Sequence, residues 1–448
     1  MDRITNRPNR HTFAACAACL VLAGAFSWAT VALRADTIPD TLKPLPTQET
    51  NAKYNQAVDL LGKGQLKEAD ALFQQLAASD PSEFDATLGR AQIAITQQRL
   101  DQADRMVDEV LKRQDNLPEA HNMKGVVLLL QKHPDQARRE FSRAVELQPK
   151  YITPRLYLAV MAQSTQDYAG AAAAYKGITE VAPQLPAGYL GQANALMMMH
   201  READGLNVLE GWKAADPKTL LPYQVLANVY LSDHEPPKAI QQLQAALAKS
   251  PHDSTTLTIL GNAYAAAGDA RSAAAQYQAA LEANGANTDA ALRLGELEAG
   301  EGHTDQALAD FRQALKADPN NMVACNNIAW VLADQDKDLD EALRLAELAV
   351  KRDPKYADGR DTLGWVQYQR GEYSQAVSTL KVAKTLAPSS PDVAAHLGLA
   401  YAKTGQKQAA LAELKRALAP GSNVSNRPEL ERVVAELSGN SQASHPQN

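Results

Sequence analysis

Apolar residues recur at helical spacing through most of the chain, and the whole pattern repeats about every 34 residues. The two long gaps in the proline series each span a repeat in which Asp115 or Gly285 stands where proline is expected. A fixed period of this length predicts stacked copies of one helical unit rather than several unrelated domains. Successive prolines lie 68, 34, 34, 34, 68, 35 and 34 residues apart, at Pro81, Pro149, Pro183, Pro217, Pro251, Pro319, Pro354 and Pro388.

Small residues keep fixed places relative to these prolines. Gly or Ala stands twenty-four residues before the proline, as at Gly125 and Gly364, and large residues such as Phe311 flank the small ones. Small residues let two antiparallel helices approach closely, while larger ones fill the remaining space. Each period is therefore predicted to be a helix hairpin that proline ends and that Gly or Asp turns. Twelve residues before the proline stand Ala69, Ala137, Ala171, Gly205, Ala239, Ala307, Ala342 and Ala376.

Residues 257–281, LTILGNAYAAAGDARSAAAQYQAAL, resemble a tetratricopeptide repeat. Eleven such units tile residues 50–424; the ninth has one extra residue, and Arg90 and Gln192 replace the usual Leu in the second and fifth. The resemblance implies an all-α fold, a right-handed superhelical solenoid of about eleven hairpins, with a solvating cap helix over residues 425–438. The family pattern W-x₂-L-G-x₂-Y…A-x₃-F…A is met most fully at Leu257, Leu260, Gly261, Tyr264, Ala273, Tyr277 and Ala280.

The first 35 residues have the pattern of an export signal. Three arginines in the first ten residues precede an uncharged run over residues 12–33. This run is either a signal peptide cleaved after Ala35 or, at about 22 residues, a retained anchor in the inner membrane. Both hypotheses place the rest of the chain in the periplasm. No aliphatic residue stands three before Cys16 or Cys19, which disfavours lipidation. Residues 36–49 are predicted to be a Pro-rich linker and residues 439–448 a disordered tail.

Charge and known motifs argue against several function classes. The formal charge is −7, and removal of residues 1–35 leaves about −10 with no basic stripe, which argues against a nucleic-acid partner. The chain has no phosphate loop, GxSxG, HExxH or CxxC motif, and its nine histidines show no ligand spacing. His121, His200 and His396 are expected in packing or surface roles, and Cys325 as a small packing residue. Neither a metal nor another cofactor is predicted. Because the repeats and cap occupy most of the chain, no catalytic domain and no enzymatic activity are expected.

In the resembled family, the first helix of each repeat lines a concave face through positions 2, 5, 9, 12 and 13 of the repeat. Position 9 is Asn194, Asn228 and Asn262 in three consecutive repeats. A side-chain amide both donates and accepts, so a row of Asn residues can hold the backbone of an extended chain. Plain helix packing with solvated amides is the alternative. A clamp for a terminal carboxylate would need Lys or Arg at position 5, and none stands there. The adaptable wall beside the row is predicted to consist of Met197, Met198, Leu231, Leu190 and Gln224.

The first hypothesis is therefore a non-catalytic protein–protein interaction scaffold of the bacterial cell envelope that binds partner segments in this groove. Residues 326–388 are similar to repeats of bacterial exported proteins of exopolysaccharide and exosortase (PEP-CTERM) systems, which implies partners in polysaccharide biosynthesis or export. A second hypothesis is a carbohydrate-binding periplasmic solenoid, although the groove columns are poor in aromatic residues, Tyr368 excepted. A third is a regulatory subunit of an envelope enzyme. The sequence leaves the partner, the pathway and the oligomeric state open.

Overall fold

The computed structural model describes residues 48–80, 84–424 and 426–439. Its elements are all α-helices, and no strand occurs among the described residues. The predicted signal or anchor, residues 36–47 of the predicted linker, and the tail beyond residue 439 lie outside this range. Gln48 and Glu49, the last two residues of that linker, begin the first described helix. None of the described helices combines the length and the apolar character that a membrane span requires.

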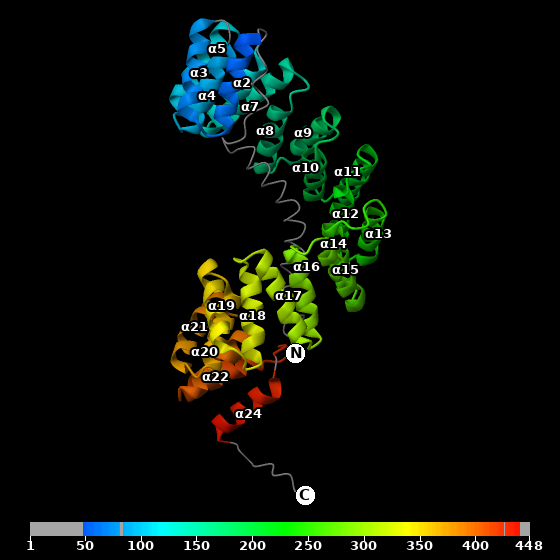
Figure 1. The fold of residues 1–448 in the computed structure, drawn as a ribbon, viewed down its shortest axis with the longest axis vertical. Coiled ribbons are helices and arrows are strands. Elements are labelled where there is room, and N and C mark those ends of the chain that lie inside the picture. The colour runs from blue at the N-terminus through cyan, green and yellow to red at the C-terminus, as the bar shows by residue number, and fades with distance from the viewer. Residues whose placement is uncertain (1–47, 81–83, 425, 440–448) are drawn as a thin grey trace. The chain divides into compact units, whose positions relative to one another are not determined.

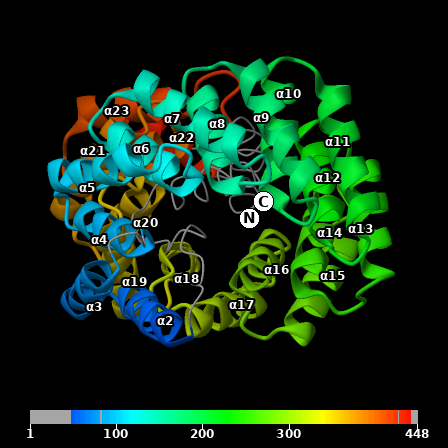
Figure 2. The same cartoon turned by 90° about the horizontal axis from the view of Figure 1, so that it is seen from above.

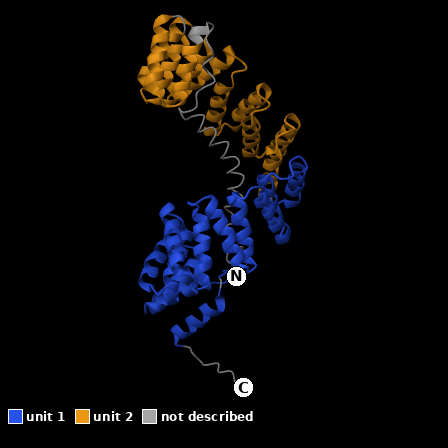
Figure 3. Ribbon diagram, in the orientation of Figure 1, with its two compact units in different colours: residues 1–12, 234–448 blue, residues 13–233 orange. Residues whose placement is uncertain are grey.

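The helices follow the predicted eleven repeats, two to each repeat, and a final single helix comes after them (Figure 1). This confirms the prediction of an all-α solenoid built from paired helices. The chain divides at residues 233 and 234 into two compact units (Figure 3). The N-terminal unit contains α2 (Gln48–Gly62), α3 (Leu66–Ser79), α4 (Phe84–Thr96), α5 (Leu100–Arg113), α6 (Pro118–Leu130), α7 (Pro134–Leu147), α8 (Ile152–Ser164), α9 (Tyr168–Val181), α10 (Pro186–Met198), α11 (Glu202–Ala215) and α12 (Leu221–Ser232).

The C-terminal unit continues the same alternation of first and second helices. Its last helix, α24, packs on α22 and α23, with Leu430 only 2% exposed on the inner side and mostly charged residues outside. It contains α13 (Pro236–Leu247), α14 (Ser254–Ala266), α15 (Ala270–Ala283), α16 (Thr288–Gly300), α17 (Thr304–Ala317), α18 (Met322–Asp334), α19 (Leu339–Arg352), α20 (Ala357–Gln369), α21 (Tyr373–Leu386), α22 (Pro391–Lys403), α23 (Lys407–Ala417) and α24 (Arg427–Ser438).

Each helix begins and ends where local chemistry directs it. Asp253, Asn287 and Asn321 stand one period apart, and each side chain accepts a hydrogen bond from a backbone N–H in the first turn of α14, α16 or α18. Such caps satisfy donors that have no partner inside the helix. Asn287 also donates to Ser254 Oγ at 2.6 Å, so this cap joins one repeat to the preceding one. The proline column follows second helices, as Pro149 follows α7.

A contact between a small and a large residue sets the distance between the two helices of a hairpin. Gly125 on α6 lies against the ring of Phe141 on α7, and a Cβ on Gly125 would stand only 2.6 Å from that ring. Gly261 and Gly295 have the same relation to the large residue sixteen positions later, with distances of 2.4 and 2.6 Å. Phe141 is fully buried. The small-residue columns of the sequence are therefore sites at which a side chain has no room.

The turn between the two helices of a repeat needs one residue in the left-handed region. Five repeats place Gly there, including Gly268, which confirms that glycine makes these turns. Repeats two to six place other residues at the same point, at a backbone cost of roughly 1–2 kcal/mol each. The extra residue of the ninth repeat lies in the longer turn 335–338, where Asp338 caps α19. The non-glycine turn residues, with φ of 56–65°, are Gln98, Lys132, Gln166, His200 and His234.

Substitution of Gly125 tests the importance of this close packing. Gly125→Ala is expected to lower the free energy of unfolding by about 1–3 kcal/mol, because the added methyl group overlaps the Phe141 ring. The matched control is Gly211→Ala in α11, where an added Cβ meets nothing within 4 Å and better helix propensity should stabilise by about 0.5–1 kcal/mol. Urea unfolding followed by circular dichroism measures both. Equal midpoints for the two variants would contradict the explanation.

Candidate partner-binding groove

The first helices of successive repeats form the inner side of each unit. In the N-terminal unit α4 contacts both α2 and α6, and in the C-terminal unit α20 contacts both α18 and α22. The second helices of neighbouring repeats make no comparable contact within the described residues. Since a stack curves toward the side on which its helices crowd together, the first helices line the concave side. Figure 2 shows the hairpins α8 to α12 following one another along the N-terminal unit.

The groove is accessible in repeats four to six, where no first helix is in close contact with the next. Met198 is 51% exposed there, while Met197 and Leu231 are half-buried. Asn194, Asn228 and Gln224 are also half-buried, and Leu190 is only 9% exposed. The predicted wall therefore consists of partly accessible apolar and amide side chains. Leu190 contributes mainly to the packing beneath it.

Asn262 differs from the other two residues of the predicted Asn row. It belongs to the C-terminal unit, whereas Asn194 and Asn228 belong to the N-terminal one. Its side-chain oxygen accepts a hydrogen bond of 2.7 Å from the hydroxyl of Tyr277, the large residue that packs against Gly261. This bond orients the amide and leaves its N–H groups as the donors for a partner. A row of three amides acting together stays a prediction.

The sequence analysis missed an aromatic cluster on the first helices of repeats nine to eleven. The ring of His396 lies between Trp330 and Trp365, with centroid distances of 5.6 and 4.6 Å. Trp365 also stacks on Tyr368 at 5.1 Å. The expectation that Tyr368 is the exceptional aromatic residue of the groove is wrong, because Trp330 and Trp365 both occupy position 9. This signal was present in the repeat register.

A buried polar pair supports the aromatic cluster. His396 is 1% exposed and Asp361 6%, and His396 Nδ1 lies 2.7 Å from Asp361 Oδ1. One repeat earlier, the residues in the same two columns are Asn326 and Thr362. Both are buried, and Asn326 Oδ1 and Thr362 Oγ have no hydrogen-bond partner within the described residues. The Asp–His pair therefore satisfies its polar atoms at a place where the preceding repeat does not.

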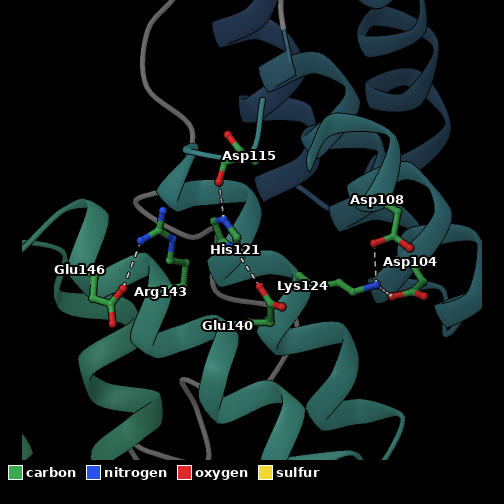
Figure 4. Close-up of polar contacts among 8 residues, drawn as sticks. All are labelled: Asp104, Asp108, Asp115, His121, Lys124, Glu140, Arg143 and Glu146. Carbon is green, nitrogen blue, oxygen red and sulfur yellow. Dashed lines mark hydrogen bonds and ion pairs between the residues drawn. The ribbon is translucent and has the colours of Figure 1, made fainter. Parts of the chain in front are cut away.

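His121 and Lys124 lie on α6 and bind acidic groups on both sides (Figure 4). The two ring nitrogens of His121 face Glu140 Oε2 at 2.6 Å and the carbonyl oxygen of Asp115 at 2.8 Å. The hydrogen bond to Glu140 raises the pKa of His121, since both contacts favour a doubly protonated ring. Lys124 Nζ lies 2.8 Å from Asp104 and 2.7 Å from Asp108. These contacts confirm a packing role for His121.

Arg90 makes the same connection one repeat before Lys124. Its Nε lies 2.9 Å from Asp70 on the preceding second helix. Arg90 and Lys124 both stand at position 7, where the family has Leu, and their carboxylate partners Asp70 and Asp104 are also 34 residues apart. An ion pair therefore replaces the usual apolar contact between these repeats. The departure at Arg90 from the family pattern has a structural compensation.

Two further candidates for chemistry lie in the C-terminal unit. Cys325 is fully buried, and burial raises the pKa of its thiol, which confirms a packing role. Among the described residues, Glu298, Glu301 and His303 form one group whose side-chain ligand atoms lie within 4.8 Å of one another. His303 Nδ1 is 2.7 Å from Glu298 Oε2 in this exposed turn. The group is an internal ion-pair cluster.

Comparison with family models decides the family. Four models, each of the tetratricopeptide repeat, match the chain: one at residues 60–126 and 335–395, and a second at 225–286, 258–321 and 292–357. The third matches residues 118–151 and the fourth residues 391–419. Together they cover residues 60–151 and 225–419, well over half of the chain. The chain is a tetratricopeptide-repeat protein. Proteins of this family commonly bind protein partners on such repeats, and the fold is typical of non-catalytic scaffolds.

Solved structures similar to this tetratricopeptide-repeat protein include the Cut9–Hcn1 complex of the APC/C. It is 13% identical, with 87% of this chain and 96% of that chain covered and a TM-score of 0.46. YrrB, described as having an unusual peptide-binding site, is 19% identical over 44% of this chain and 97% of its own, with a TM-score of 0.36. TTC0263 of Thermus thermophilus is 22% identical over 41% and 98%, with a TM-score of 0.34. These values support no conclusion about partners. Comparison with curated proteins gives no match.

Asp310, on α17, supplies a pH test of the region beside the Glu298 group. Burial first, and then the charge of Glu298, raises the pKa of Asp310 from 3.8 to about 6. An acid whose pKa is raised by folding destabilises the protein when ionised, so this contribution to stability is favourable below pH 4 and is lost as the pH rises toward and beyond 6.

Asp310→Asn is therefore expected to raise the free energy of unfolding at pH 7.5 by on the order of 1 kcal/mol, because partial exposure screens the effect. Below pH 4 the difference from the wild type should disappear. Unfolding midpoints across this pH range provide the measurement, and Glu282→Gln, at an exposed carboxylate on α15, is the control. A difference independent of pH would show that Asp310 stays ionised.

Proposed function

We propose that this tetratricopeptide-repeat protein is a non-catalytic scaffold that binds an extended segment of a protein partner along the first-helix groove of repeats four to six. The observation that carries the proposal is the accessible strip of apolar and amide side chains there, with Met198 more than half exposed. Methionine adapts its shape to different partners. The amides of Asn194 and Asn228 can pair with backbone groups of an extended chain without reading its sequence.

We further propose that the scaffold acts in the bacterial cell envelope, in exopolysaccharide biosynthesis or export. Two sequence features support this proposal: the basic and then apolar N-terminal pattern of residues 1–35, and the similarity of residues 326–388 to repeats of exported proteins in such systems. The acidic balance of the chain agrees with protein partners rather than nucleic acid. A partner that is itself an envelope enzyme would make this chain its regulatory subunit.

A pulldown from an envelope extract tests the groove. The triple variant with Asn194, Asn228 and Asn262 changed to Ala is expected to recover at least about tenfold less partner than the wild type, because several backbone hydrogen bonds of about 1 kcal/mol each are lost. The control variant changes three exposed glutamines on second helices to Ala: Gln74, Gln241 and Gln375. Recovery that is equal for the triple variant and the wild type would exclude the groove.

The aromatic cluster favours carbohydrate binding as a second candidate function. Trp365 and Tyr368 are half-buried and nearly parallel, with an interplanar angle of 8°, and the indole N–H of Trp365 has no hydrogen-bond partner within the described residues. Sugars bind by stacking on aromatic faces and pairing with such polar groups. Calorimetric titration with polysaccharide fragments distinguishes the two functions, since saturable binding without any protein partner would place this candidate first.

A further inference from the structure

The first-helix face of the N-terminal unit has an unusual charge distribution. Repeats two to six place twenty-five residues at groove positions 2, 5, 9, 12 and 13, and only Asp85 and Glu119 among them are charged. In the whole chain 22% of residues are charged. Both charged residues are acidic and both lie in repeats two and three, whereas repeats four to six have no charge at these positions. A bound segment therefore meets negative charge at one end of the groove and a neutral surface beyond it.

Two buried oxygen atoms accompany these acids. Tyr54 on α2 is 1% exposed and Asn122 on α6 is 3% exposed. Both stand at position 5 of their repeats, and Tyr54 Oη and Asn122 Oδ1 have no hydrogen-bond partner within the described residues. The contacts of α4 with α2 and α6 bring these first helices together. Burial, followed by the charges of Asp85 and Glu119, raises the pKa of the Tyr54 phenol, so both carboxylates lie near that hydroxyl group.

This cluster is rich in hydrogen-bond acceptors. It combines two carboxylates, an amide oxygen and a phenol oxygen, and Glu119 is itself only 6% exposed. A buried polar atom without a partner costs about 1–3 kcal/mol, so this arrangement is stabilised by a ligand that donates several hydrogen bonds. The basic residues of the adjoining first helices, Arg90 and Lys124, pair with carboxylates on second helices instead. An ammonium group offers three donors and no acceptor, and therefore complements the cluster.

We infer that the cluster of Tyr54, Asp85, Glu119 and Asn122 binds a cationic group of the partner segment, a lysine side chain or an amino terminus, while the uncharged continuation of that segment lies along repeats four to six. This inference rests on the proposed groove function and gives it a chemical class of partner. The recognised sequence has one basic group next to a stretch of uncharged residues. The polarity is opposite to that of a clamp for a terminal carboxylate, which needs Lys or Arg at position 5.

The inference is tested by selecting a randomised twelve-residue peptide library, displayed with free amino termini, on the immobilised protein in the presence of a metal chelator. The expected result is enrichment of peptides with one lysine beside an uncharged stretch. Fluorescence anisotropy then measures individual peptides. Replacement of the lysine by norleucine should weaken binding at least about tenfold, and Glu119→Gln should weaken the lysine peptide equally. Glu119→Gln should leave the norleucine peptide unaffected, because the two changes remove the same interaction.

Control variants separate the possible failures. Tyr54→Phe removes only the phenol oxygen and should also weaken the lysine peptide. Glu180→Gln, at an exposed carboxylate on the second helix α9, should have no effect. Peptides selected without any basic preference, whose binding depends on Asn194 and Asn228, would overturn the cationic site and leave the groove. Peptides insensitive to both sets of variants, or no enrichment at all, would overturn the groove function and this inference together.

Discussion

The close approach of a small residue on one helix to a large residue on its partner is the constraint on which the structure depends. Gly125 and Phe141 show it most simply, because a single methyl group at Gly125 would overlap the ring. The contact fixes the distance between helices within one hairpin, and the hairpin then presents the same two faces to its neighbours. Since each repeat touches little beyond the next, local geometry of this kind propagates along a unit. The position of every groove residue is inherited from it.

Crowding of the first helices then decides which groove positions are open. In the N-terminal unit, position 5 is buried at Tyr54 and Asn122, where first helices touch, and half-exposed at Leu156 and Gln224, where they do not. In the C-terminal unit, contact between α18 and α20 buries Asn326 and Asp361 at the same position. One column of the repeat therefore supplies packing residues in some places and accessible surface in others. Buried polar residues in this column mark the points at which the chain departs from a plain apolar stack.

Most of the fold was predictable from the sequence because its determinants are local and periodic. The hairpins, the proline column, the glycine turns and the extra residue of the ninth repeat all follow from spacing within one or two periods. The pairing of His396 with Asp361 was not predictable, because it depends on how closely two first helices approach. The gathering of Tyr54 and Glu119 joins residues 65 positions apart and depends on the same approach. The tryptophans at position 9 could have been found by reading that column to the end of the array.

The turns of repeats two to six have a consequence for the motions of the chain. Gln98, Lys132, Gln166 and His200 hold a backbone conformation that other repeats assign to glycine, so these turns store free energy that is released when a hairpin opens. Local opening equilibria depend on such differences as much as on the size of the core. The hairpins that present Asn194 and Met198 therefore open at a lower free-energy cost than hairpins turned by glycine with equal packing. Backbone strain at the rim of the array places its most adaptable hairpins beside its most accessible surface.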